Sequence, residues 1–383
     1  MHATAGTTAM GSATVDLRAI AHNLRVLTDG AGAGALAVVK ADGYGHGALP
    51  VARTLVDAGV IGLGVAHVGE ALALREGRIT APITAWLHAP DTDFEAAIAG
   101  DVDIAVSSPR QLAAVVEAAA RRGEAATVTV KVDTGMNRSG VAADEWPGFV
   151  DAFARAHADG ALRLRGVMAH LACGDEPDNP ANDEQARGLR AAVDDLKRVG
   201  AEAELVHLAN TPAALTRPDL SFDAIRPGIG VYGLNPVPQH SSADLIPAMT
   251  LRTQVSLVKH VPAGGGVSYG HTFRTPVDTV TAVIPVGYAD GVPRALSGRL
   301  RVRINGRDFP GVGRICMDQF VVDLGPAGGG VTEGDEVVVF GTGADGEATA
   351  REWADLTGTI DYEIVTGIAP RIARRYVGPE VSS

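Results

Sequence analysis

The sequence predicts an α/β protein in which a (β/α)8 barrel is followed by a mostly β C-terminal domain. Up to about residue 245, short apolar runs alternate eight times with helical patterns. This alternation indicates right-handed βαβ crossovers and a parallel sheet, and eight units in roughly 230 residues match the usual size of a barrel. After Pro247 the pattern changes to alternating strands and tight glycine turns, which is typical of a β domain.

The barrel strands are predicted from β-branched or alanine-rich runs that lie between turn signals. In chain order these runs are GALAVVK near Ala35, VIGLGVA near Ile61, PITAWLH near Ile83, DIAVSS near Ile104, TVTVKVD near Val130, LRGVMAH near Val167, AELVHLAN near Val206 and FDAIRPG near Ile225. Two intervening helices carry their own end signals. SPRQLAAVVEAAARRG begins after Ser107 or Ser108 and stops at Gly123, and NDEQARGLRAAVDDLKRVG stops at Gly200.

The C-terminal domain is predicted from strand-like runs and one late helix around TAREWADLTG. The runs are TLRTQVSLVKHV, TVTAVIPVGYADGV, LRVRINGRDF, QFVVDLG and DEVVVFG. We therefore expect a flexible N-terminus over residues 1–14, a barrel over 15–245 and a β domain over 246–383. The glycine-rich GAGAGA at residues 30–35 precedes its strand instead of following it, which argues against a dinucleotide-binding loop.

Composition favours a soluble globular protein that acts on a small molecule. The chain has 383 residues, 46% of them hydrophobic, and a net charge of -12, which makes nucleic acid or an anionic membrane an unsuitable partner. Cys173 and Cys316 are too few and too far apart for a disulfide framework or a thiolate metal site. With no secretory signal and no bilayer-length apolar run, we expect a cytoplasmic location.

Reactive side chains follow the predicted barrel strands at their C-terminal ends, where barrels carry their active sites. Lys40 ends the first strand, Lys131 and Asp133 end the fifth with Arg138 just beyond, His170 ends the sixth, Asn210 and Thr211 end the seventh, and Arg226 ends the eighth. We therefore expect these side chains to converge on one rim of the barrel.

Six motifs together resemble the alanine racemase family. They are VVKADGYGHG, KVDTGMNRSG, HLANTPA, AIRPGIGVYG, VSYGHTF and GRICMDQF, and they span nearly the whole chain. The resemblance implies a pyridoxal 5'-phosphate enzyme with a barrel and a β domain. It also implies interconversion of L- and D-alanine through a Schiff base and two-base proton transfer, which in bacteria supplies D-alanine for peptidoglycan.

Lys40 in KADGYGHG resembles the lysine that binds the cofactor in this family. It must be unprotonated to form a Schiff base, and a desolvated strand end among cations would lower its pKa. An isolated strand-end lysine, by contrast, is usually solvent-exposed. Gly43, Gly45 and Gly47 fit either a turn or the close approach of a flat ring.

The resemblance assigns the cofactor phosphate to backbone and hydroxyl donors near the last two strands of the barrel. RPGIG supplies the amides, although an ordinary tight turn is an equal alternative for this motif alone. Thr211 replaces the serine of many members and keeps the hydroxyl. The expected cofactor-binding residues are Lys40, Tyr44, Arg138, His170, Asn210, Thr211, Arg226, Gly228, Ile229 and Tyr362.

Two arginines and a lysine resemble residues that tune the cofactor. Arg226 matches the arginine facing the pyridine nitrogen, and a guanidinium donates a hydrogen bond without protonating the ring. Arg138 matches the arginine beside the phenolic oxygen and contributes to substrate binding. Lys131 matches a position that is carbamylated in some members, and otherwise it is a strand lysine.

Racemisation needs an acid/base group on each face of a planar carbanion. Lys40 serves one face, and the resemblance assigns the other to Tyr269, contributed by the neighbouring subunit. Because a free tyrosine has a pKa of about 10, we expect His170 to assist by linking Tyr269 to Arg226. An alternative metal site of His170 with Cys173 and Asp175 fits no standard zinc spacing, so no metal is expected.

The resemblance places three further residues of the β domain around the substrate. Met317 matches the residue whose backbone amide meets the substrate carboxylate, and Tyr288 and Asp318 match residues that narrow the channel entrance. Since the barrel and the β domain both contribute, we expect a head-to-tail homodimer with shared active sites. The alternatives are a broader serine and alanine racemase, a non-catalytic pyridoxal phosphate carrier, and a ligand-sensing or scaffolding protein on the same fold.

Overall fold

The computed structural model describes residues 10–378. The chain forms two compact units, which are described separately. The first, called the barrel unit below, comprises Ile20–Gly43 and Ala48–Leu245. The second, called the β unit, comprises the described residues up to Ala19, Tyr44–Gly47 and the described residues from Ile246 on. No helix among the described residues combines the length and the apolar character needed to cross a membrane.

The barrel unit is built on a closed parallel barrel, which confirms the predicted fold class. Its eight strands are β2 (Gly34–Val38), β3 (Gly62–Val65), β4 (Ile83–Ala85), β5 (Asp103–Val106), β6 (Ala126–Lys131), β7 (Leu162–Met168), β8 (Leu205–His207) and β9 (Ala224–Ile225). The barrel closes where Gly34 and Ala35 of β2 pair in parallel with Ala224 and Ile225 of β9. Strands β3, β4 and β5 are buried at every position, and all of their residues except Thr84 and Asp103 are apolar or glycine.

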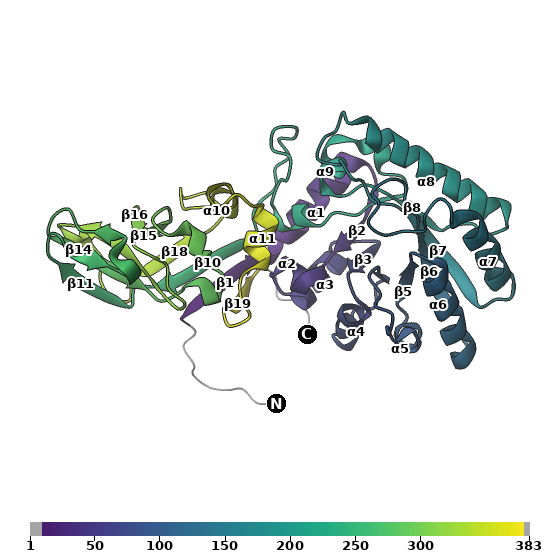
Figure 1. Cartoon of the computed structure of the whole chain (residues 1–383), viewed down its shortest axis with the longest axis horizontal. Helices are drawn as coiled ribbons and strands as arrows, with labels where there is room; N and C mark the ends of the chain where they lie inside the picture. Colours follow the sequence, from purple (N-terminus) through teal and green to yellow (C-terminus); the bar gives the residue numbers. More distant parts are fainter. Residues whose placement is uncertain (1–9, 379–383) are drawn as a thin grey trace. The chain divides into compact units, whose positions relative to one another are not determined.

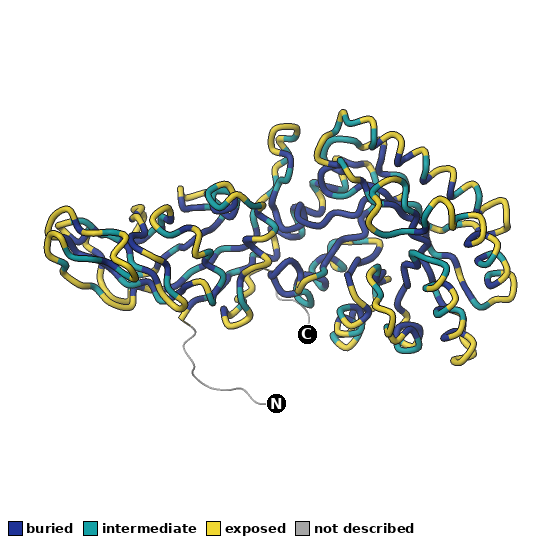
Figure 2. The backbone as a smooth tube through the Cα atoms, in the orientation of Figure 1, coloured by how far each residue is buried: buried dark blue, intermediate teal, exposed yellow. Residues whose placement is uncertain are grey.

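Helices follow the strands around the barrel (Figure 1). They are α1 (Leu17–Ala31), α3 (Ala48–Asp57), α4 (Val68–Glu76), α5 (Phe94–Ala99), α6 (Pro109–Arg122), α7 (Trp146–Ala158), α8 (Pro180–Arg198) and α9 (Thr211–Thr216). The predicted end signals of α6 are confirmed, because the Ser108 hydroxyl accepts from the Gln111 amide at 3.2 Å and Gly123 takes a left-handed φ of 65°. The barrel strands lie in buried backbone, whereas the outer helices alternate between buried and exposed positions (Figure 2).

The β unit contains a nine-stranded sheet in the order β11-β14-β17-β16-β15-β18-β10-β1-β19. In chain order its strands are β1 (Gly11–Asp16), β10 (Met249–Gln254), β11 (Leu257–Val261), β14 (Thr279–Ile284), β15 (Arg301–Ile304), β16 (Arg307–Val312), β17 (Phe320–Gly325), β18 (Glu336–Phe340) and β19 (Ala373–Val377). A two-stranded sheet pairs β12 (Gly266–Val267) with β13 (Phe273–Arg274). The predicted late helix is α10 (Ala350–Thr357), and a second helix, α11 (Asp361–Thr366), follows it.

Strand β1 corrects the expectation that residues 1–14 form a flexible terminus. Residues 1–9 lie outside the described residues, but Gly11–Asp16 pairs with β10 on one side and β19 on the other. Ala13 and Val15 are fully buried, and they alternate with half-buried neighbours. The strand forms because both of its edges are paired and one of its faces is apolar.

A buried carboxyl lies inside the barrel, at the start of strand β5. Asp103 Oδ2 accepts hydrogen bonds from the hydroxyls of Thr84 at 2.6 Å and Thr129 at 2.7 Å, and Arg165 Nε lies 3.8 Å from the same oxygen. Its Oδ1 is buried and has no hydrogen-bond partner among the described residues. Burial raises the pKa of Asp103 to about 6, although the two hydroxyls and Arg165 oppose the rise.

The buried Asp103 predicts a pH-dependent contribution to stability. Because its pKa is higher in the folded than in the unfolded chain, its stabilising contribution is complete below about pH 4 and is lost as pH rises to about 6. A shift of this size corresponds to about 3 kcal/mol. We expect the free energy of unfolding of the parent to fall by about this amount between pH 4 and 7, relative to that of Asp103→Asn. Urea unfolding of both proteins across this range measures the free energy of unfolding of the parent minus that of Asp103→Asn. If this difference stays constant or rises with pH, the prediction is wrong.

Candidate functional site

The predicted lysine of the first strand lies at the mouth of the barrel. Lys40 follows β2 by two residues and begins a turn, α2 (Lys40–Tyr44), in which residues 41–44 have positive φ. The pKa of Lys40 is lowered, first by burial and then by the charges of Arg138 and Arg226, while Glu70 opposes the change. A lowered pKa increases the fraction of neutral amine, which is the nucleophilic form.

A second lysine lies in the same cluster of cations. Lys131 is the last residue of β6 and is only 5% exposed, and its Nζ donates to the Ser139 hydroxyl at 2.5 Å. Burial, together with Arg226, Arg138 and Lys40, lowers the pKa of Lys131 to about 8, against the opposing effect of Asp133. The barrel mouth therefore carries more positive than negative charge, as expected of a site for an anionic ligand.

Arg226 lies between two histidines. Its Nη1 donates to Nδ1 of His207 at 2.6 Å, and its Nη2 donates to Nδ1 of His170 at 3.1 Å and to the Ala169 carbonyl at 2.8 Å. A guanidinium has no acceptor, so both Nδ1 atoms must be unprotonated and the neutral rings carry their protons on Nε2. Burial and then Arg226 lower the pKa of each histidine well below its ordinary value, which keeps both rings neutral. Burial also lowers the pKa of Arg226, to about 10.

Backbone amides after β9 meet the hydroxyl predicted at the seventh strand. Thr211 Oγ1 accepts from the amide of Gly228 at 3.0 Å and from that of Gly230 at 3.3 Å. A Cβ on Gly230 would lie 2.6 Å from the Thr211 methyl carbon, so this close approach requires glycine. Asn210 caps the following helix α9, since its Oδ1 accepts from the Ala213 amide at 3.2 Å. Amides and a hydroxyl gathered at the last two strands suit a phosphate.

Arg138 and Ile229 belong to the barrel unit, and the remaining predicted site residues belong to the β unit. Tyr44 is buried, which raises its pKa, and its ring centroid lies 6.2 Å from that of Tyr362 on α11. Tyr269, at the start of a short 3-10 turn, is 69% exposed, and Met317 is 53% exposed.

Two residues of the β unit that were predicted for the channel entrance lie on loops joined by an arginine. Arg371 Nη2 donates to Asp318 at 2.6 Å, and its Nε donates to Asp290 at 2.6 Å. Asp290 ends the turn that begins with Tyr288, which is itself exposed. Arg371 therefore fixes the loop of Tyr288 relative to that of Asp318.

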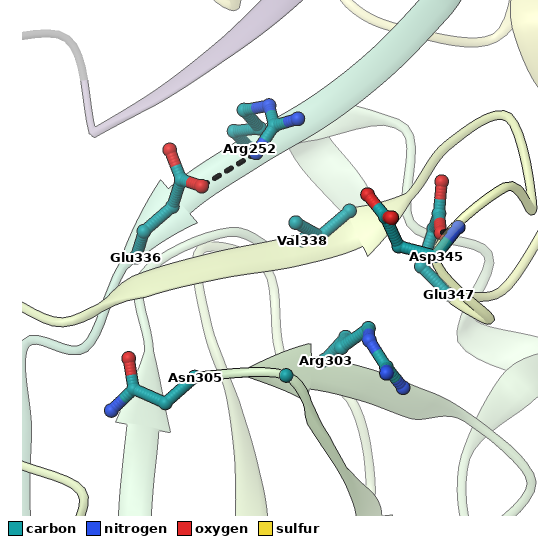
Figure 3. Close-up of a pocket in the computed structure, with 8 residues that line it drawn as sticks. Arg252, Arg303, Asn305, Glu336, Val338, Asp345 and Glu347 are labelled. Atoms are coloured by element: carbon teal, nitrogen blue, oxygen red, sulfur yellow. Dashed lines mark hydrogen bonds and ion pairs between the residues drawn. The ribbon is translucent and has the colours of Figure 1, made fainter.

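A shallow depression on the β unit lies among residues other than those predicted for the site (Figure 3). Its two arginines pair with carboxylates of the same unit: Arg252 with Glu336 at 2.5 Å, and Arg303 with Asp308 at 2.7 Å. Among residues 10–378, no three His, Cys, Asp or Glu side chains are grouped so as to hold a metal ion. We therefore take the barrel mouth as the candidate site.

Two residues of the barrel mouth were not predicted from the sequence. Glu70, near the start of α4, contacts the backbone that follows Lys40. His207 lies at the end of β8, three residues before Asn210, and accepts from Arg226. A histidine at the end of a barrel strand was the available signal for His207, whereas no motif marks Glu70.

The fold and the barrel mouth define a class: barrel enzymes whose chemistry uses an amine in a site for an anionic ligand. Models of the alanine racemase N-terminal and C-terminal domains match residues 15–236 and 248–376. The chain therefore belongs to the alanine racemase family, which confirms the resemblance seen in its motifs.

Individual relatives agree over almost the full length. The chain is 57% identical to an alanine racemase of Mycolicibacterium vanbaalenii, over 97% of this chain and 95% of that one. It is 55% identical to an alanine racemase of Mycobacterium tuberculosis, over 96% of each chain. The crystal structure of alanine racemase from Streptomyces lavendulae superposes with a TM-score of 0.93 at 43% identity, covering 97% of this chain and 98% of that one.

Proposed function

We propose that this protein is an alanine racemase that interconverts L- and D-alanine with pyridoxal 5'-phosphate as its cofactor. The observation that carries the proposal is Lys40, whose pKa is lowered at the barrel mouth among Arg138 and Arg226. The family membership and the names of relatives at 55–57% identity support the reaction. In this role the enzyme acts in the cytoplasm and supplies D-alanine for peptidoglycan.

The donor set of the barrel mouth fits pyridoxal phosphate. The cofactor's phosphate and phenolic oxygen are anionic, and the cluster of Lys40, Lys131, Arg138 and Arg226 has an excess of positive charge. When bound, the cofactor supplies a conjugated ring that accepts the electron pair left at Cα after proton removal. Lys40 would bind its carbonyl carbon, and Arg138 would bind its phenolic oxygen. The residues proposed for the phosphate are Tyr44, Asn210, Thr211, Gly228, Ile229 and Tyr362.

Arg226 is the residue proposed to face the ring nitrogen. Its Nη hydrogens already donate to His207, His170 and the Ala169 carbonyl, and its Nε–H makes no such contact among the described residues. The Nε–H is therefore the donor available to the ring. A guanidinium keeps its proton, so Arg226 limits electron withdrawal by the ring and favours return of a proton to Cα over transamination.

Two groups exchange the Cα proton, one on each face of the substrate. The Lys40 amine serves one face, and Tyr269 of the partner subunit serves the other. The Nδ1 atom of His170 accepts from Arg226, which leaves its Nε2–H to donate to the phenolic oxygen of the partner's Tyr269. This donor stabilises the oxygen when it holds negative charge, so the tyrosine can both take and return the proton.

The remaining residues bind substrate and control access. Met317 of the partner subunit donates its backbone amide to the substrate carboxylate together with Arg138, and Tyr288 and Asp318 narrow the entrance. Carbamylation of Lys131 would convert a cation beside Arg138 into an anion that orients it. In this arrangement residues 15–245 carry the cofactor lysine, residues 246–383 supply the opposite-face tyrosine to the partner, and the active unit is a homodimer.

Solvent exchange at Cα tests the proposed reaction. We expect the purified protein with pyridoxal phosphate and L-alanine in D2O to form D-alanine that carries deuterium at Cα. Nuclear magnetic resonance measures the deuterium, and a D-amino-acid assay measures the product. A panel of other L-amino acids, serine included, serves as the comparison. Cofactor binding without exchange of alanine would contradict the proposal, as would faster turnover of serine.

A further inference from the structure

We propose that Glu70 is a positioning residue for Lys40, because its carboxylate fastens the strained turn after Lys40 to the start of helix α4. This role rests on the proposed function, in which the Lys40 amine binds the cofactor carbonyl. Glu70 acts through the backbone on the direction in which Lys40 leaves the barrel.

The turn after Lys40 has a backbone that ordinary residues avoid. Ala41 has φ 53° and ψ 51°, Asp42 has φ 52° and ψ 48°, and Gly43 has φ 60° and ψ 47°. Tyr44 continues the run with φ 52°. Consecutive left-handed residues with side chains are disfavoured by contacts between Cβ and the backbone. Such a turn persists only where the surroundings hold it, and backbone strain of this kind is often found at functional sites.

The carboxylate of Glu70 stabilises the start of the turn through a hydrogen bond. Its Oε1 accepts from the amide of Ala41 at 2.7 Å, directly after Lys40. Its Oε2 accepts from the amides of Ala66 at 2.7 Å and His67 at 3.2 Å, which lie between strand β3 and helix α4. One carboxylate therefore joins the segment after the first barrel strand to the segment after the second, and charged acceptors make such hydrogen bonds strong.

The far end of the turn is held separately. Asp42 Oδ1 accepts from the amide of Ala48, the first residue of α3, at 2.8 Å. Within the turn, the Gly43 amide donates to the Val39 carbonyl at 2.9 Å. Loss of Glu70 would therefore remove the acceptor of the Ala41 amide and leave the hydrogen bonds of the Gly43 and Ala48 amides in place.

Glu70 also has the opposite charge to the other groups that act on Lys40. Arg138 and Arg226 are cations contributed by the segments after β6 and β9. Glu70, from α4, is the anion that opposes their effect on the pKa of Lys40. Removing Glu70 should lower the pKa of Lys40 further. A shift in the pH dependence of cofactor attachment therefore distinguishes this role from that of a helix cap.

A matched pair of variants tests the proposal on the apoprotein titrated with pyridoxal phosphate. Gln111 is the control, because its Oε1 accepts from the Ser107 amide at 2.8 Å just before helix α6, and this helix follows strand β5, away from the Lys40 turn. We expect Glu70→Ala to weaken cofactor binding at least tenfold, and Gln111→Ala to change it less than twofold. The midpoint of the pH dependence of cofactor attachment should move to lower pH in Glu70→Ala alone.

A glycine variant distinguishes an effect of Glu70 on the turn from a general loss of stability. Glycine adopts left-handed conformations readily, so Ala41→Gly in the Glu70→Ala background should recover binding about fivefold. If Glu70→Ala does not fold, Glu70→Gln, which keeps one acceptor, takes its place in the same series. Equal binding by the parent and the Glu70 variant, or equal losses in the Glu70 and Gln111 variants, would overturn the proposal. A parent that does not bind pyridoxal phosphate would instead overturn the proposed function.

Discussion

Replacing Lys40 by alanine is expected to abolish racemisation of alanine, lowering kcat by about 10⁴-fold or more. Alanine removes both the amine proposed to bind the cofactor and the group proposed to exchange a proton on one face of the substrate. These two losses act on the same reaction in both directions, so formation of D-alanine and of L-alanine should fall together. Formation of each enantiomer from the other, with deuterium incorporation in D2O, measures the effect.

Lys197→Ala is the control for loss of a lysine. Lys197 lies on the exposed face of helix α8, where its Nζ pairs with Glu202 at 3.1 Å. Surface ion pairs contribute little to stability, so its activity should stay within about twofold of the parent. Residual activity of Lys40→Ala above about one per cent of the parent would show that another group provides the amine.

The positions of all eight barrel strands could be predicted from the sequence because each is a short run, rich in β-branched residues or alanine, that lies between turn signals. Buried parallel strands such as Gly62–Val65 and Asp103–Val106 can be identified from local sequence alone, without knowing which strands they pair with. The polar residues and glycines on either side mark their ends. The end of helix α6 was equally predictable, because Ser108 and Gly123 satisfy its terminal backbone groups locally.

Elements that depend on distant partners could not be predicted in this way. Strand β1 consists mostly of small and polar residues, and its sheet partners β10 and β19 lie more than two hundred residues away in the sequence. Helix α11 contains β-branched residues that suggest a strand. However, Asp361, Ile364 and Val365 are buried at helical spacing, so tertiary packing decides its conformation.

The barrel-mouth residues were predictable where they end a strand or match a family motif. Glu70 meets neither condition, because its importance comes from backbone amides that the fold brings to it, including that of Ala41. The glycines indicated a turn, but its left-handed conformation at Ala41 and Tyr44 was not predictable, since these residues rarely adopt it. Sequence patterns therefore identified reactive groups more readily than the residues that position them.

Activity should be recovered when two inactive variants are mixed, if each site is shared between two subunits. We expect Lys40→Ala and Tyr269→Phe to be nearly inactive alone, since each removes one of the two proton-exchanging groups from every site. After subunit exchange at equal amounts, half of the dimers are mixed, and each mixed dimer has one native and one doubly altered site. About a quarter of the parental activity should therefore return, as measured by D-alanine formation.

The arithmetic of the mixture distinguishes a shared site from one made within a single chain. If Lys40 and Tyr269 of the same chain served one site, every chain in the mixture would carry one defect and no native site could form. Mixing Lys40→Ala with a Lys40→Ala/Tyr269→Phe double variant is the control, because every site then lacks the lysine. Tyr269 is 69% exposed, as expected of a side chain that contacts the partner subunit. Fluorescence energy transfer between labelled subunits establishes that exchange has occurred, and exchange without recovered activity would contradict the shared site.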